Sequence, residues 1–193
     1  MDINKLIERV KNILLTPKTE WPVIAQEQTD VAKLYTGYIM ILAAIPAVFQ
    51  FLVYTIGGSP IAGLVVAVLS YALALVITFV MALIVDALAP TFGAEKSQIQ
   101  ALKTVAYANT AGWVAGVFLI IPIIGWLLAF AAAIYGYVLM YFGLPHTMKS
   151  PPEKTGGYFA VIIVIGIVLG AVVGMVLAGI AATMLVGAAM VRG

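Results

Sequence analysis

Long apolar stretches alternate with short charged segments along the chain. Asp, Glu, Lys and Arg are absent from residues 34–85, 104–148 and 155–191. A helix needs about 20 predominantly apolar residues to cross the roughly 30 Å hydrocarbon core of a bilayer. Each stretch is long enough for at least one such helix, so the pattern predicts an all-α, polytopic membrane protein.

Glycine and proline divide the first two stretches into pairs of helices. Gly57 and Gly58 end one helix, Ser59 is placed to cap the next, and Pro60 suits its first turn. Pro122 breaks the second stretch, and the third has no comparable break. The predicted spans of this five-transmembrane-helix bundle cover residues 35–56, 61–85, 101–121, 123–143 and 158–184.

Residues 1–33 mix charged and apolar side chains, unlike residues 34–193. Over residues 2–15 the apolar side chains share one face of a helix, which predicts an N-terminal amphipathic interfacial helix in the headgroup plane. Packing on the cytoplasmic ends of the spanning helices fits this pattern equally. Thr16 and Pro17 end the helix, because proline disfavours helical geometry in the residue before it. Residues 1–33 are therefore expected to be a cytoplasmic segment beside the transmembrane domain.

Basic residues lie almost entirely on one side of this arrangement. Nine of the ten Lys and Arg residues fall on the side of the N-terminus, and Arg192 alone falls on the other. The positive-inside rule therefore predicts a cytoplasmic N-terminus and an outward C-terminus. The net charge of +2 is too small to indicate a nucleic-acid partner, and the lipid bilayer is the expected environment.

Few residues are available for catalysis. The chain has no cysteine and one histidine, which excludes thiolate chemistry and a clustered zinc site. Ion-coupled transport usually needs an ionisable group at membrane depth, and none falls at the centre of a predicted span. Asp86 and Lys103 stand at the cytoplasmic ends of spans, as a salt bridge or boundary residues, with a coupling role for Asp86 as the alternative. We expect no enzymatic activity, no cofactor and no metal.

Polar side chains inside the predicted spans are candidates for an interhelical contact or a solute site. They are Gln50, Tyr107, Asn109, Thr110 and Trp113. In lipid such groups ordinarily form hydrogen bonds between helices, which contribute about 0.6–2 kcal/mol each. Lining a solute site is the alternative.

Glycines recur every four residues on the last predicted span, at Gly166, Gly170 and Gly174. Small residues at this spacing let helix backbones approach closely in lipid. This stripe predicts close helix packing, either within the chain or in a homo-oligomer.

Four stretches resemble the Yip family of Ypt/Rab-interacting membrane proteins, in its prokaryotic branch. They are RVKNILLTPKTEW at 9–21, YANTAGWVAGVF at 107–118, IPIIG at 121–125 and IYGYVLMYFGLP at 134–145. The family-motif positions that the resemblance implies are Pro17, Trp21, Tyr107, Thr110, Trp113, Tyr135, Gly143 and Leu144. Family members commonly have proline where this chain has Ala111.

The resemblance implies a five-span protein of a prokaryotic plasma membrane. Eukaryotic relatives take part in vesicle traffic and contact small GTPases through a cytoplasmic N-terminal region, which is much shorter here. The resulting expectation is a non-enzymatic scaffold, adaptor or bilayer-organising factor, with a cytoplasmic protein partner or a second copy of the chain as candidate partners. A small transporter or channel for an uncharged or amphiphilic solute is the alternative.

Overall fold

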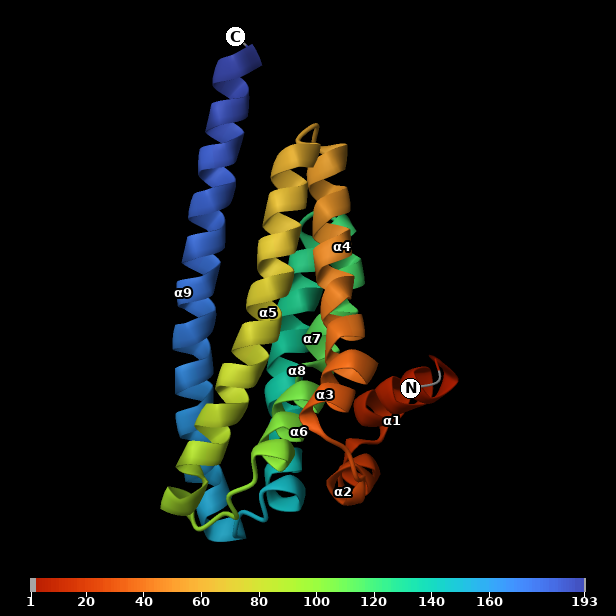
Figure 1. Ribbon diagram of the computed structural model, residues 1–193, viewed down its shortest axis with the longest axis vertical. Coiled ribbons are helices and arrows are strands. Elements are labelled where there is room, and N and C mark those ends of the chain that lie inside the picture. Colours follow the sequence, from red (N-terminus) through yellow and green to blue (C-terminus); the bar gives the residue numbers. More distant parts are fainter. Residues whose placement is uncertain (1–2, 193) are drawn as a thin grey trace.

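The computed structural model describes residues 3–192, which form helices and, within that range, no strand. The long helices lie side by side, and the short helices α1 and α2 project from the lower part of the bundle (Figure 1). The α-helices are α1 (Ile3–Leu15), α2 (Pro17–Gln26), α3 (Val31–Leu34), α4 (Met40–Ile56), α5 (Pro60–Leu88), α6 (Gln98–Ala108), α7 (Thr110–Ala115), α8 (Ile124–Thr147) and α9 (Pro152–Arg192). A π-helical turn covers Tyr35–Ile39, and 3-10 turns cover Ala89–Phe92 and Gly116–Ile120.

Four helical segments of the described chain are long and apolar enough to cross a membrane. They are Val31–Ile56, Pro60–Phe92, Ile124–Thr147 and Pro152–Met184. The predicted spans 35–56, 61–85, 123–143 and 158–184 fall within these four segments. The chain is therefore an all-helical membrane protein, as the charge-free stretches indicated.

The third predicted span, 101–121, is not one continuous helix, so the five-helix count is not confirmed. Asn109 separates α6 from α7, and a 3-10 turn over Gly116–Ile120 follows α7. No proline is needed for this break, since Ala111 stands where the family commonly has one. Hydropathy alone could not reveal it, because residues 104–121, on both sides of the break, are all uncharged.

Close backbone contacts account for the irregular end of this segment. A Cβ atom at Gly116 would lie 2.7 Å from the Cα of Pro46, so α4 and this turn meet without an intervening side chain. A Cβ at Gly125 would lie 2.0 Å from the carbonyl oxygen of Phe118, on the other side of the turn at Pro122. The chain therefore turns tightly into α8 at Pro122, the residue that was predicted to break the second apolar stretch.

The α4–α5 connection follows the predicted glycine and proline pattern, with one difference. Gly58 adopts a positive φ of 79°, and Pro60 occupies the first turn of α5. Ser59 stands at the N-cap position, but its side chain makes no capping hydrogen bond. A Cβ at Gly63 would lie 2.6 Å from the Tyr54 Cβ, so the two helices approach closely beside the turn.

The N-terminal helix uses its apolar face in two ways. Leu6 and Ile13 are buried against the bundle, whereas Ile3 and Ile7 are 59% and 60% exposed. In Figure 1, α1 lies across the direction of the long helices. The helix thus packs on the bundle, and its placement in the headgroup plane stays a prediction.

Single cysteines test the orientation of the bundle, because the chain has none of its own. Ile56 ends α4 at the end of the bundle opposite α1, and Lys96 lies in the connection before α6. We expect a membrane-impermeant maleimide to label Ile56→Cys in intact cells and Lys96→Cys only after permeabilisation. The physical reason is the concentration of basic residues on the Lys96 side. The reverse pattern would show that the N-terminus faces outward.

Candidate functional site

The helices α1 and α2 form a short pair that packs on α6, α7 and α8. Pro17 occupies the first turn of α2, where a missing N–H costs no hydrogen bond, so the chain turns directly after α1. The Tyr135 hydroxyl of α8 donates to the Leu14 carbonyl over 2.7 Å. One end of α1 is therefore fixed to the bundle by a motif tyrosine.

A largely buried ion pair joins the two short helices. Arg9 of α1 pairs with Glu20 of α2 and, over 2.7 Å, with Glu27 just beyond it. The Arg9 and Glu20 side chains are 13% and 10% exposed, so little water competes for their charges. The Arg9 guanidinium also lies 5.7 Å from the ring centroid of Tyr107. Removing Arg9 would leave the Glu20 carboxylate largely buried without its partner.

Aromatic rings continue this contact into the bundle. Tyr107 of α6 contacts Trp21 edge to face at a centroid distance of 6.3 Å and Tyr38 at 4.6 Å. The Tyr38 and Thr110 hydroxyl oxygens lie 2.7 Å apart in a hydrogen bond. Trp21 and Thr110 are fully buried, and Tyr38 and Tyr107 nearly so. Segments far apart in the sequence therefore meet in one aromatic cluster.

The motif glycine of α8 makes room for the tryptophan of α2. A Cβ at Gly143 would lie 2.8 Å from the Cη2 and Cζ2 atoms of Trp21. Leu144, the next motif residue, is fully buried. The α8 helix continues to Thr147 through Pro145, beyond the predicted end at 143. Only glycine lets the indole lie against the α8 backbone at this height.

Lys103 caps the end of α2 and forms none of the ion pairs of the described residues, so the salt-bridge alternative does not apply to it. Its Nζ donates to the carbonyls of Ile24 at 2.9 Å, Ala25 at 3.4 Å and Glu27 at 2.5 Å. The Gln100 side-chain nitrogen donates to the Ala25 carbonyl as well, over 2.9 Å. These carbonyls end α2, where a positive charge is favoured by the helix dipole. Lys103 is only 2% exposed, so it lies inside the contact between α2 and α6.

Asp86 and Lys103 form no ion pair with each other among the described residues, which leaves a place at the membrane boundary as the other expectation for the two charges. Asp86 is 8% exposed near the end of α5, and its Oδ1 has no hydrogen-bond partner among the described residues. The four ion pairs found over residues 3–192 include neither Asp86 nor Lys103. The two charges therefore have separate surroundings.

We call the contact described above the docking contact: Arg9, Glu20, Trp21, Glu27, Tyr38, Lys103, Tyr107, Thr110, Tyr135 and Gly143. Six of its members were marked from the sequence, five of them as motif positions. Arg9, Glu20, Glu27 and Tyr38 were not. Arg9 and Glu20 lie within the motif stretch 9–21, where oppositely charged residues on successive short helices could have indicated a pair.

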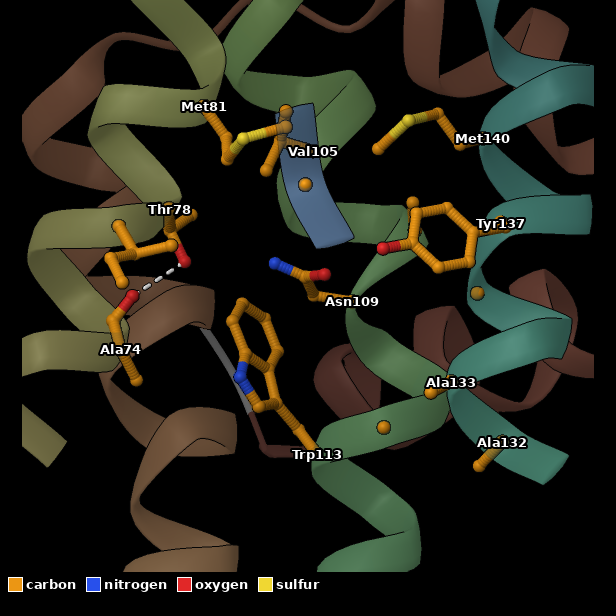
Figure 2. Close-up of a pocket in the computed structure, with 15 residues that line it drawn as sticks. Ala74, Thr78, Met81, Val105, Asn109, Trp113, Ala132, Ala133, Tyr137 and Met140 are labelled. Carbon is orange, nitrogen blue, oxygen red and sulfur yellow. Dashed lines mark hydrogen bonds between the residues drawn. The ribbon is translucent and has the colours of Figure 1, made fainter. Parts of the chain in front are cut away.

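A separate cavity of about 270 Å³ lies between α5, α6, α7, α8 and α9. Asn109 and Trp113 line it, together with Thr78 and Tyr137 (Figure 2). Two of the residues grouped as a solute site from the sequence thus share a cavity.

The remaining predicted solute residues lie elsewhere. Tyr107 and Thr110 belong to the docking contact. Gln50 of α4 accepts a hydrogen bond of 3.0 Å from the Ser70 hydroxyl and lines a second hollow between α4, α5, α8 and α9. Gln50 and Ser70 therefore form the interhelical hydrogen bond that was the ordinary expectation for such residues.

The glycine stripe of α9 is used within the chain at one position. A Cβ at Gly166 would lie 3.2 Å from the Tyr137 hydroxyl oxygen, whereas Cβ atoms at Gly170 and Gly174 would meet nothing within 4 Å. Only 6% of the most apolar part of α9 is buried, against 22–28% in the other spans. Close packing explains Gly166, and a homo-oligomeric role for the other two glycines stays a prediction.

The spanning helices and the docked pair define a helical membrane protein in which the largely buried Arg9–Glu20 ion pair holds two short helices on the lower part of the bundle (Figure 1). The Yip1 domain matches residues 11–175, which include every residue of the docking contact except Arg9. The chain belongs to the Yip1 family, as the four motif stretches indicated.

The chain is also similar to curated membrane proteins of bacteria. It is 25% identical over 167 residues to the inner membrane protein YohC of Escherichia coli strain K12, covering 79% of this chain and 85% of the relative. The YohC protein of Escherichia coli O6:H1 gives the same figures. No solved structure matches the chain. Both relatives are bacterial inner membrane proteins.

Two glycine substitutions test the contact between Trp21 and α8. Gly143→Ala places a Cβ against the indole and should lower the free energy of unfolding in detergent by about 1–3 kcal/mol. Gly156→Ala is the matched control on α9, where a Cβ meets nothing within 4 Å. It should change stability by less than about 1 kcal/mol, in the stabilising direction. Equal effects of the two substitutions would contradict the close approach of Trp21.

Two lysine substitutions test the cap on α2. Lys103→Met keeps the length of the side chain but removes the ammonium donor from the Ile24 and Glu27 carbonyls, while Gln100 still donates to Ala25, so it should cost about 2–3 kcal/mol of unfolding free energy. Lys149→Met removes an ion pair with Glu95 whose side chains are 66% and 64% exposed, and should cost under about 1 kcal/mol. Chemical unfolding followed by tryptophan fluorescence measures both. A neutral Lys103→Met would show that α2 does not depend on this cap.

Proposed function

We propose that this Yip1-family chain is a non-enzymatic membrane scaffold or adaptor. The spanning helices anchor it, and the docked α1–α2 pair forms a fixed cytoplasmic surface beside the bilayer. The observation that carries the proposal is the docking contact, in which buried charges, aromatic rings and a helix cap all hold two short helices in place. Such a contact favours a rigid surface for binding over a flexible tail.

The outward side of α1 fits a position at the membrane surface. Ile3 and Ile7 are exposed although the adjacent apolar side chains pack inward, and Lys5 and Lys11 are exposed on the same helix. Apolar side chains flanked by lysine are typical of helices that lie in the headgroup region of anionic membranes. This supports a cytoplasmic N-terminus, as does the distribution of basic residues.

The same surface has groups that a protein partner could contact. Val23 of α2 is 53% exposed, and Leu15 at the end of α1 is 69% exposed. An adaptor needs such groups to be held in a fixed arrangement, because ordering a flexible segment reduces affinity. The docking contact supplies that order before any partner binds. The alternative of a small transporter has less support, because Gln50 and Thr110 do not face the cavity that Asn109 lines.

Photocrosslinking in cells tests the adaptor function. A benzophenone attached at Lys5→Cys should give discrete protein adducts, and the same group at Ile56→Cys, at the far end of α4, should not. Adding Arg9→Ala should reduce the Lys5 adducts several-fold, because the pairs with Glu20 and Glu27 are lost.

Lys11→Ala is the matched control for that substitution, since Lys11 is exposed and forms none of the described ion pairs. Its adducts should match those of the parent. Absence of discrete adducts at Lys5, or adducts that Arg9→Ala leaves unchanged, would contradict a docked adaptor surface.

A further inference from the structure

The cavity beside Asn109 contains polar groups that the protein itself does not use. None of the hydrogen bonds found over residues 3–192 involves the Asn109 side-chain amide, the Trp113 indole nitrogen or the Tyr137 hydroxyl. In Figure 2 the Asn109 side chain projects into the cavity, and the Tyr137 hydroxyl points toward it. Thr78 adds a hydroxyl that already donates to the Ala74 carbonyl over 2.8 Å. Three unused groups therefore meet in one space.

These groups lie among helices that cross the bilayer. Besides α6 and α7, the cavity walls come from α5, α8 and α9, which belong to three of the four membrane-spanning segments. Unpaired polar groups are costly in such surroundings, so a ligand that supplies hydrogen-bonding groups would be stabilised there.

The rest of the lining is uncharged. Met81, Val105 and Met140 form apolar walls and are 7%, 1% and 4% exposed. Methionine side chains adapt their shape to a ligand more readily than branched ones do. No lysine, arginine, aspartate or glutamate lines the cavity. A charged ligand would be desolvated without a counter-ion, whereas a neutral head with an alkyl chain would find both polar and apolar partners.

Small residues keep the space open. Gly112, Gly136 and Gly166 all line the cavity. A Cβ at Gly136 would lie 2.9 Å from the Ala108 carbonyl oxygen, so that glycine is needed for packing. A Cβ at Gly112 would meet nothing within 4 Å, so packing does not require glycine there. The open space at Gly112 is therefore a property of the cavity and can be filled by substitution.

We infer that this cavity binds an uncharged amphiphile, a lipid with a hydroxyl or ester head and a single acyl chain, by hydrogen bonds to Asn109, Trp113 and Tyr137. At about 270 Å³ the cavity lies near the lower end of the range for ligand sites, which suits a small head with part of one chain. The ligand enters from the hydrocarbon region, where such lipids are already concentrated. The inference does not depend on the adaptor function.

Tryptophan quenching by a brominated lipid tests this site. The probe is a monoacylglycerol with a dibrominated chain, titrated into nanodiscs that contain the full-length protein with Trp126→Phe. Trp126 is replaced because it is 71% exposed and would be quenched by bulk lipid. Of the two remaining tryptophans, Trp113 lines the cavity and Trp21 is fully buried. We expect saturable quenching. A phosphatidylcholine with the same dibrominated chains should give only weak quenching that rises in proportion to its mole fraction.

Two substitutions of glycine by leucine separate the cavity from the lipid-facing surface. Gly112→Leu should abolish the saturable quenching, because its side chain fills the cavity. Gly170→Leu, which also enters open space but lies outside this cavity, should leave the quenching intact. Asn109→Leu should raise the half-saturating mole fraction about tenfold by removing one hydrogen-bonding group.

Several results would overturn the inference. Quenching that never saturates, or that saturates equally with phosphatidylcholine, would show that no site for a neutral head exists. Saturable quenching that persists in Gly112→Leu would place the lipid elsewhere. Should Gly112→Leu fail to fold by circular dichroism, the titration of the parent protein and of Asn109→Leu decides the question in the same way.

Discussion

A guanidinium that is almost shielded from water has to be neutralised, and the N-terminal part of the structure depends on how Arg9 achieves this. Its two carboxylate partners lie in and just beyond α2, and its third neighbour is the ring of Tyr107 in the bundle. One side chain thereby joins α1, α2 and α6. Replacing it with an apolar residue would leave Glu20 buried and unpaired, which costs more than the pair contributes.

The motif residues of the Yip1 family gain a common physical explanation from this arrangement. Trp21, Tyr107, Tyr135 and Gly143 come from three helices, yet each contributes to holding α1 and α2 on the bundle. Trp21 needs a glycine, Gly143, opposite its ring. Tyr107 packs against both Trp21 and Arg9. Thr110 extends the cluster through its hydrogen bond to Tyr38.

Much of the fold follows from hydropathy, because a bilayer permits few alternatives to long apolar helices. Four of the predicted spans correspond to spanning helices for this reason. The third did not, since the interruption depends on Asn109 and on the approach of Gly116 to Pro46, a residue of another helix. The spacing of residues within one helix cannot show which residue of another helix, here Pro46, will lie against Gly116.

The candidate sites show the same limit. Asn109 and Thr110 are adjacent in sequence, but one side chain faces the cavity and the other faces Tyr38. Gln50 lies by a different hollow altogether. Grouping them correctly requires the rotation of each helix about its axis, which is fixed by packing between segments. The resemblance to the family identified more of the docking contact, since it marks residues that meet in space.

The sequence separations within the docking contact set an order for biosynthesis. The carbonyl of Ile24 accepts from Lys103, which is synthesised 79 residues later. The carbonyl of Leu14 accepts from Tyr135, which is synthesised 121 residues later. Because the chain is made from its N-terminus, α1 and α2 emerge long before their binding surface exists. The two helices are therefore accessible to membrane lipid, chaperones and proteases until α8 has been inserted. The docking contact can therefore form only after the helices up to α8 have been inserted.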